Sequence, residues 1–239
     1  MSKLSRTTSI ATLAILCVIA APLAAQEKSV KPGINKSFED PNVPNFIVRF
    51  EREGRDAFDH RNEIVEACGL KPGMIVADVG AGTGLFTRMF AREVGADGTV
   101  YAVDISDKFL EHIKETAQEA KLNNIVYVQC EQDSVGLPAN SIDMAYICDT
   151  YHHFEFPFKT MRSIHRALRP GGQVVLVDLE RIEGKSSEFI MGHVRAGKEV
   201  FTSEISQAGV RQIAEKEGML DESYFIRFEK IESPDQADE

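Results

Sequence analysis

The chain has 239 residues, of which 43% are hydrophobic, and its formal net charge is −10. This length and apolar content suit one α/β domain with a full hydrophobic core. An acidic protein repels phosphate backbones, so the charge argues against nucleic acid as a partner.

The N-terminus has the pattern of a secretory signal peptide. Two basic residues, Lys3 and Arg6, precede an apolar stretch at residues 10–21, and small residues end at Ala25. We therefore expect residues 1–25 to be cleaved, which gives a secreted or periplasmic protein with no stable membrane insertion. The alternative is an uncleaved anchor, although the apolar run is shorter than the ~20 residues that span a bilayer.

The mature chain divides into a leader, one domain and a tail. Residues 26–44 are polar and contain prolines, and residues 233–239 form an acidic tail. The domain takes up residues 45–232 and begins with a charged and apolar stretch at 45–68, where Gly54 separates two predicted helical pieces.

Apolar runs then alternate with helical patterns. Strands are predicted at residues 74–79, 99–104, 125–130, 142–148 and 173–179. Helices are predicted between them at residues 85–94, 107–120 and 157–168. This alternation indicates a parallel sheet that is buried on both faces.

The last three predicted elements are a helix at 199–208 and strands at 210–216 and 223–231. The connection between the two strands is too short for a parallel crossover, so they form an antiparallel hairpin. The predicted fold class is α/β: a three-layer, Rossmann-like, seven-stranded sheet, mostly parallel, with a C-terminal antiparallel hairpin.

A glycine-rich turn follows the first strand. Gly80, Gly82 and Gly84 occupy alternate positions, Ala81 lies between the first two, and Asp78 comes just before them. Glycines there allow backbone angles that a Cβ would penalise, and let a ligand meet free N–H groups at a helix start. A dinucleotide-binding turn needs its third glycine one position later, so a nicotinamide or flavin cofactor is disfavoured.

This spacing, with the acid before it, resembles motif I of class I S-adenosylmethionine-dependent methyltransferases. Residues 169–173, Arg-Pro-Gly-Gly-Gln, also resemble the turn before the fifth strand of that family. The matching motifs extend over about residues 69–179. The resemblance implies the parallel sheet with its terminal hairpin, and S-adenosylmethionine as the cofactor.

Two further acids fit the resemblance. Asp104 ends the second strand, where a carboxylate can accept both ribose hydroxyls of a nucleoside. It could instead cap the helix at 107–120, but Ser106 or Asp107 already serves that need. Asp133 matches the residue that takes the adenine amino group in the family, and its alternative is a solvated loop acid. The expected cofactor-binding residues are Asp78, Gly80, Ala81, Gly82, Gly84, Asp104, Ile105, Asp133, Ser134 and Asp149.

The acceptor side is expected where the fourth strand ends, because ligands lie at the carboxyl ends of parallel strands. Cys148 or Asp149 should approach the methionine part or the methyl group of the donor. His152 and His153 are expected at the pocket mouth as candidate general bases, a role worth ~10²–10⁴ in rate. The alternatives are that the two histidines only pack or hold a loop, and that Cys148 either belongs to the core or serves thiol or metalloid chemistry.

Two segments could cover the acceptor. Residues 45–61 and 180–198 carry several arginines and histidines, which either attract an acidic acceptor or form solvated faces paired with glutamates. The chain has no Cys-x-x-Cys or His/Cys metal spacing, so no metal is predicted. Cys130 and Cys148 should stay unpaired, because strands three positions apart lie ~14 Å from each other.

Three functions remain open. The first is an exported methyltransferase that acts on a small-molecule or lipid-like acceptor, similar to the stand-alone group that includes ubiquinone/menaquinone C-methyltransferases. The second is a non-catalytic nucleoside-binding protein on the same fold. The third, a dinucleotide oxidoreductase, is disfavoured by the glycine spacing and the hairpin. The sequence leaves the oligomeric state open.

Overall fold

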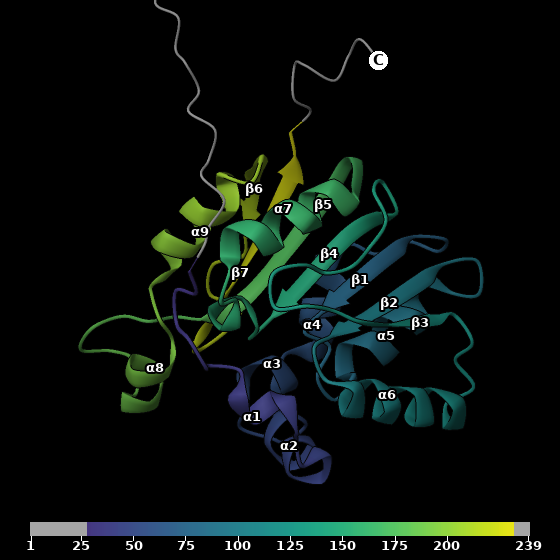
Figure 1. The fold of residues 1–239 in the computed structure, drawn as a ribbon, viewed down its shortest axis with the longest axis horizontal. Coiled ribbons are helices and arrows are strands. Elements are labelled where there is room, and N and C mark those ends of the chain that lie inside the picture. The colour runs from purple at the N-terminus through teal and green to yellow at the C-terminus, as the bar shows by residue number, and fades with distance from the viewer. Residues whose placement is uncertain (1–27, 232–239) are drawn as a thin grey trace, which may run out of the picture.

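A computed structural model describes residues 28–231 and contains one seven-stranded sheet (Figure 1). The strands are β1 (Ile75–Val79), β2 (Thr99–Asp104), β3 (Ile125–Gln129), β4 (Ile142–Cys148), β5 (Leu168–Leu179), β6 (Val210–Glu215) and β7 (Ser223–Lys230). Their order is β3-β2-β1-β4-β5-β7-β6; the first five pair in parallel, and β7 is antiparallel to both of its neighbours. The predicted fold class is confirmed.

Helices cover both faces of the sheet, which makes three layers (Figure 1). They are α1 (Lys36–Glu39), α2 (Val43–Phe50), α3 (Asp56–Asp59), α4 (Arg61–Cys68), α5 (Leu85–Val94), α6 (Asp107–Glu119), η1 (Tyr151–His153), α7 (Pro157–Ala167), α8 (Glu188–His193) and α9 (Lys198–Ser206). Side chains of α4, α5 and α6 join one buried apolar cluster, and side chains of α7 and α9 join the other.

The central strands show why the sheet is buried on both sides. In β4, Ala145 and Ile147 belong to one cluster, whereas Met144 and Tyr146 belong to the other. Successive side chains of a strand point to opposite faces, so a strand that is apolar at every position needs cover on both. The near-continuous apolar runs of the sequence therefore become the central strands.

The main difference from the predicted elements is at the start of β5. The predicted turn at 169–173 does not precede the strand but lies inside it, because Leu168 pairs with Ile142 and Gln173 pairs with Met144. Four residues on β5 thus face one residue on β4. Glycine and proline make this a bulge, which sequence alone reads as a loop.

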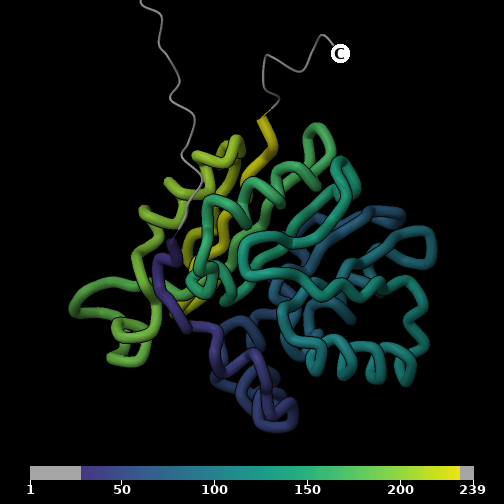
Figure 2. Tube along the Cα trace, in the orientation of Figure 1, coloured from purple at the N-terminus to yellow at the C-terminus, as the bar shows by residue number. Residues whose placement is uncertain are grey.

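The N-terminal part of the described chain packs against the domain instead of hanging free. α1 lies within the predicted polar leader, and the amide of Val30 donates to the carbonyl of Glu155 at 2.9 Å. Figure 2 shows this purple segment running beside the green chain of η1 before it reaches α1. α8, which the sequence did not predict, lies in the segment after β5.

Three expectations concern residues at the two ends. The signal peptide at 1–25, the first part of the leader and the acidic tail at 233–239 all lie outside the described residues. Within residues 28–231, none of the helices has the length and apolar character needed to cross a membrane.

Candidate active site

A cavity of about 540 Å³ opens at the carboxyl ends of the parallel strands. It lies where β1 and β4 are neighbours but their helices leave in different directions, the usual ligand position in such sheets. The cavity is lined by the glycine turn, by the ends of β2 and β4, by the N-terminal helices and by α8. Ten of the predicted site residues line it: Asp78, Gly80, Ala81, Gly82, Asp104, Ile105, Ser134, Asp149, His152 and His153.

The three glycines have different tasks. All adopt positive φ, which favours glycine. A Cβ on Gly80 would lie 2.3 Å from Cγ2 of Thr150, so glycine is required where β1 meets the loop after β4. A Cβ on Gly84 would lie 2.6 Å from Cγ1 of Ile113, and Gly84 does not line the cavity. Gly84 therefore has a packing task against α6, and its expected contact with the ligand stays a prediction.

The first amides of the glycine turn, which precede the helix start at Leu85, are already bonded within the protein. The amides of Gly80 and Ala81 both donate to the carbonyl of Val103, at 2.8 and 3.1 Å. The amide of Gly82 donates to Oδ2 of Asp104 at 2.8 Å. These amides hold the turn against β2. Because Gly80 and Gly82 have no Cβ, a ligand in the cavity can approach the backbone of the turn closely.

Asp104 is buried, and its two oxygens tie the glycine turn to the start of α6. Its Oδ1 accepts from the amide of Ser106 at 2.9 Å, while the Ser106 hydroxyl has no partner in the part of the chain that the structure describes. Ser106 is the N-cap residue of α6, which was one of the two predicted candidates, but its side chain makes no capping hydrogen bond, and Asp104 accepts from the amide of Ser106 instead. Burial raises the pKa of Asp104 to about 6. Each oxygen keeps lone-pair capacity for a further donor, and the residue lines the cavity.

Asp78 is also buried and lines the cavity. The hydroxyl of Thr87 donates to its Oδ2 at 2.6 Å, which links β1 to α5 across the glycine turn. Burial raises the pKa of Asp78 to about 7, and the nearby Asp104 adds to this shift. Asp78 therefore stabilises the glycine turn by connecting the strand before it to the helix after it.

Asp133 is the other predicted residue that does not line the cavity. Its Oδ2 accepts from Nζ of Lys159 at 3.0 Å, and 41% of the side chain is exposed. The neighbouring Gln132 and Ser134 do line the cavity. The predicted adenine contact of Asp133 stays a prediction.

The end of β4 contributes a charged pair. Asp149 has φ +48°, and its Oδ2 accepts from Nη2 of Arg55 at 2.7 Å. Its other oxygen is buried in the cavity wall and has no hydrogen-bond partner among residues 28–231. Arg55 also donates to the carbonyl of Phe50 at 2.8 Å, which fixes the N-terminal helices over the cavity. The sequence offered no local sign of this partner.

Cys148 lies beside this pair as a thiol. Burial raises its pKa well above the ordinary value, and Asp149 adds to the shift. The thiolate is the reactive form of cysteine, so this environment suppresses its nucleophilic chemistry. Cys68, Cys130 and Cys148 are all free, as predicted for Cys130 and Cys148.

His152 was expected at the pocket mouth, but it is buried in the cavity wall, with 2% of its surface exposed. Its Nδ1 lies 2.6 Å from Oδ1 of Asp178, and its amide donates to Oδ2 at 3.1 Å. Burial disfavours the charged imidazole, but the Asp178 carboxylate outweighs burial and raises the pKa of His152. Asp178, near the end of β5, is a site residue that the sequence analysis missed, although a single acid at the end of an apolar strand was a usable signal.

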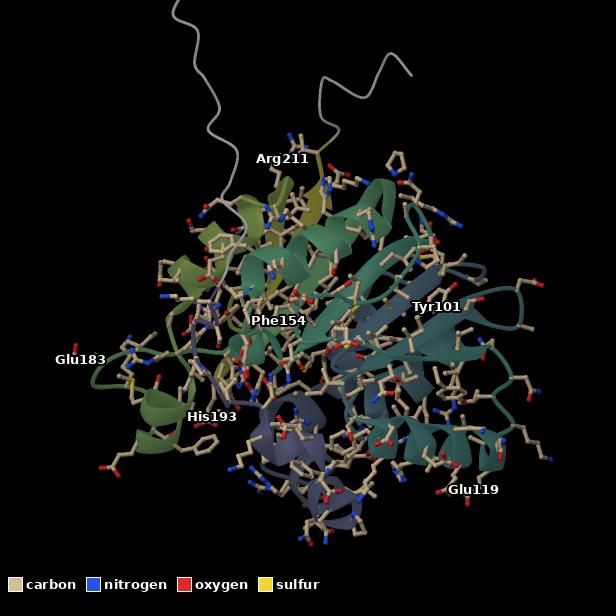
Figure 3. The ribbon with its side chains drawn as sticks, viewed as in Figure 1. Tyr101, Glu119, Phe154, Glu183, His193 and Arg211 are labelled. Atoms are coloured by element: carbon tan, nitrogen blue, oxygen red, sulfur yellow. The ribbon has the colours of Figure 1, made fainter. Side chains whose placement is uncertain are left out.

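His153 and His193 face each other across the cavity wall. Their Nε2 atoms lie 3.2 Å apart, and Nδ1 of His153 lies 3.2 Å from Oδ1 of Asn35. Burial, with the neighbouring imidazoles, lowers the pKa of His153 to about 2 and that of His193 to about 4. Figure 3 labels His193 on α8 and Phe154 directly after η1, the two elements that bring these rings together.

Comparison with known proteins agrees with the resemblance seen in the sequence motifs. Residues 77–176 match the family model described as "Methyltransferase domain". A ubiquinone/menaquinone biosynthesis C-methyltransferase, UbiE, of Idiomarina loihiensis is 30% identical over 49% of this chain and 47% of its own length. The chain thus spans about half the length of that relative.

Solved structures share the fold. A SAM-dependent methyltransferase from Aquifex aeolicus has a TM-score of 0.64 and 23% identity, over 84% of this chain and 99% of its own. A possible exported protein from Bordetella parapertussis has a TM-score of 0.65 and 12% identity, over 84% of this chain and 85% of its own. Together, the matches confirm the resemblance to class I methyltransferases and imply S-adenosylmethionine as the cofactor of the domain.

Proposed function

Since the chain carries a class I methyltransferase domain, we propose that it transfers the methyl group of S-adenosylmethionine to a small-molecule acceptor. The observation that carries the proposal is one cavity that is lined both by the glycine turn with Asp104 and by a partly aromatic set of side chains. The first part suits a nucleoside donor, and the second leaves room for an acceptor beside it.

The donor would lie along the carboxyl ends of β1, β2 and β4. Asp104 would accept the ribose hydroxyls, and Ser134 lines the side where the adenine would lie. The unpartnered oxygen of Asp149 is available to the ammonium of the methionine part, since a buried carboxylate oxygen without a partner favours a cationic donor. These assignments leave the sulfonium near the end of β4.

The acceptor would lie on the side of η1 and α8, where the wall is partly apolar. Phe38, Phe154, Phe189 and Ile190 line this side of the cavity. Such a lining fits an apolar or lipid-like acceptor, and the matched relatives are named for ubiquinone and menaquinone biosynthesis, which supports the same class. Because the sulfonium is already activated, the protein acts mainly by holding donor and acceptor in line.

We also propose that the protein is exported. The basic residues, apolar stretch and small residues before position 26 support a cleaved signal, and a fold relative is described as a possible exported protein. Fractionation of the source cells, with N-terminal sequencing of the recovered protein, tests this. A start near Gln26 in the periplasmic or secreted fraction is expected; retention of residues 1–25 on cytoplasmic protein would contradict it.

The first experiment on function is calorimetric titration of the protein with S-adenosylmethionine and its demethylated product. Binding of both in the micromolar range is expected, followed by transfer of labelled methyl groups to lipid extracts or small quinols. Failure of both ligands to bind would overturn the proposal. Tight binding without transfer to any acceptor would instead support the non-catalytic alternative.

A further inference from the structure

We propose that His152, His153 and His193 form a binding site for one divalent transition-metal ion of the zinc class. This site uses none of the residues proposed to hold the methyl donor and lies in the cavity wall, on the side proposed for the acceptor. The spacing of histidines and cysteines in the sequence predicted no metal. This proposal differs from that prediction because the third ligand, His193, comes from α8, forty residues along the chain from His153.

The first argument is the distance between ring nitrogens. One ring nitrogen from each of the three histidines lies within 4.8 Å of the others. The Nε2 atoms of His153 and His193 are 3.2 Å apart. Two ligands of a tetrahedral zinc ion with bonds of 2.0–2.1 Å lie ~3.3 Å apart, so this pair already has the required separation.

The ring positions agree with the distances. The ring centres of His152 and His153 are 4.4 Å apart, and each lies 5.0 Å from the ring centre of His193. Three imidazoles on one tetrahedral ion have ring centres about 5 Å apart. The three rings therefore have about the spacing that one shared tetrahedral ion requires.

The second argument is the set of outer partners. The carboxylate of Asp178 lies within hydrogen-bond distance of Nδ1 of His152, and the side-chain amide oxygen of Asn35 lies within hydrogen-bond distance of Nδ1 of His153. Metal-bound histidines almost always donate their other N–H to a carboxylate or carbonyl, which fixes the tautomer and presents Nε2 to the ion. His152 and His153 both have this arrangement, and Asp178 also supplies negative charge near the ion.

The alternative is a metal-free N–H···N hydrogen bond between His153 and His193. It accounts for one pair but gives no task to the carboxylate-bound His152 beside it. Three imidazole nitrogens that lie together in the cavity wall favour a transition-metal ion over Mg²⁺ or Ca²⁺, which prefer oxygen ligands.

The place of the cluster indicates what the ion would do. All three histidines line the cavity, so a fourth coordination position would face the acceptor. Catalytic zinc sites have three protein ligands and such an open position. An ion there would bind a hydroxyl or phenol oxygen of the acceptor and lower its pKa. The inference thus assigns a hydroxylated acceptor to the proposed methyltransferase, and it rests on that function only in this last step.

The test is metal binding by the protein purified without a histidine tag. After chelator treatment, titration with Zn²⁺ and Co²⁺ should show one site, and Co²⁺ should give the intense visible absorption of four-coordinate geometry. His153→Ala and His193→Ala should lower the affinity at least tenfold, and Asp178→Asn should lower it 10–100-fold. His193 lies on the surface helix α8, so its replacement leaves the core intact even where replacement of buried His152 unfolds the chain.

His60→Ala provides the matched control. His60 belongs to a second group with Asp56 and Asp221, and the side chain of Asp221 is 91% exposed. The His60→Ala substitution should leave the metal affinity unchanged. Absence of Zn²⁺ and Co²⁺ binding, equal binding by the His193→Ala variant, or loss of binding in His60→Ala would overturn the proposal. Because donor binding is measured separately, failure of the metal site leaves the methyltransferase proposal intact.

Discussion

At the scale of single residues, the site depends on buried groups that connect elements. Asp104 joins the glycine turn to α6, Asp78 joins β1 to α5, and Gly80 lets the turn pass beneath Thr150. Each of these residues was identified in the sequence as a ligand contact. The structure shows that each also has a structural task, so substitutions there must be read with a stability measurement beside the binding measurement.

Asp104→Asn should weaken S-adenosylmethionine binding by about 10–100-fold. A carboxylate accepts a charge-assisted bond worth ~1.5–3 kcal/mol from a ribose hydroxyl, whereas an amide presents only one oxygen. Calorimetry measures the change. Asp107→Asn, at the exposed start of α6, is the control and should bind as the original protein does. Equal affinity in Asp104→Asn would remove the ribose assignment.

Gly80→Ala should lower the free energy of unfolding by about 2–4 kcal/mol, because a Cβ meets Thr150 in addition to the cost of positive φ. Gly171→Ala is matched, since Gly171 has φ +71° but no atom within 4 Å of the new Cβ. It should cost only ~1–2 kcal/mol. Urea unfolding measures both. A Gly80→Ala cost no larger than that of Gly171→Ala would show that the contact with Thr150 is unimportant.

At the scale of elements, segments distant in sequence close the cavity over the sheet. α2 and α3 are held by Arg55, whose guanidinium bonds to Asp149 and to the carbonyl of Phe50. The end of α8 is held from the N-terminal side, where Nζ of Lys31 donates to the carbonyl of His193 at 2.6 Å. Residues of both segments thus line the cavity, as expected if residues 45–61 and 180–198 cover the acceptor. Charged residues of both segments also form ion pairs, Glu51 with Arg88 of α5 and Arg195 with Glu204 of α9.

Arg55→Ala should cost about 1–3 kcal/mol of stability, because it leaves the largely buried Asp149 carboxylate without its partner. Arg169→Ala is the control: it removes the pair with Asp143, whose side chains are 43% and 28% exposed, and should cost under ~1 kcal/mol. Urea denaturation compares the two variants. Equal costs would show that Arg55 does not anchor the N-terminal helices.

At the scale of the whole molecule, the buried carboxyls beneath the cavity couple stability to pH. The pKa of Asp78 is raised by burial to about 7 from an ordinary 3.8, so the folded state holds a proton that the unfolded state has lost between those values. Stability therefore falls as pH rises from about 4 to 7. His153 and His193, whose pKa values are lowered, act in the opposite direction.

The contribution of Asp78 is isolated by Asp78→Asn. The difference in unfolding free energy between this variant and the original protein should grow in favour of the variant as pH rises from 4 to 7. The amide keeps an oxygen for the Thr87 hydroxyl, so packing is retained. Urea unfolding at several pH values measures the difference. A pH-independent difference would mean that Asp78 ionises normally in the folded protein.

The sequence by itself determined the sheet, its hairpin and the glycine turn, because these depend on periodicity and on residues adjacent in the chain. β2, β4 and α5 have their predicted bounds, and the cofactor family follows from the same local motifs. It did not determine that the turn before β5 is a bulge, since that depends on the register with β4.

Only the tertiary structure decided which side chains complete the cavity. Arg55 meets Asp149 across 94 positions, and Asn35 meets His153 across 118. Asp178 and His193 reach the two histidines of η1 in the same way. No local pattern records such contacts, because they arise from the order of strands in the sheet and from segments that fold back over its carboxyl edge. The donor side of the site could therefore be predicted from motifs, whereas the acceptor side required the fold.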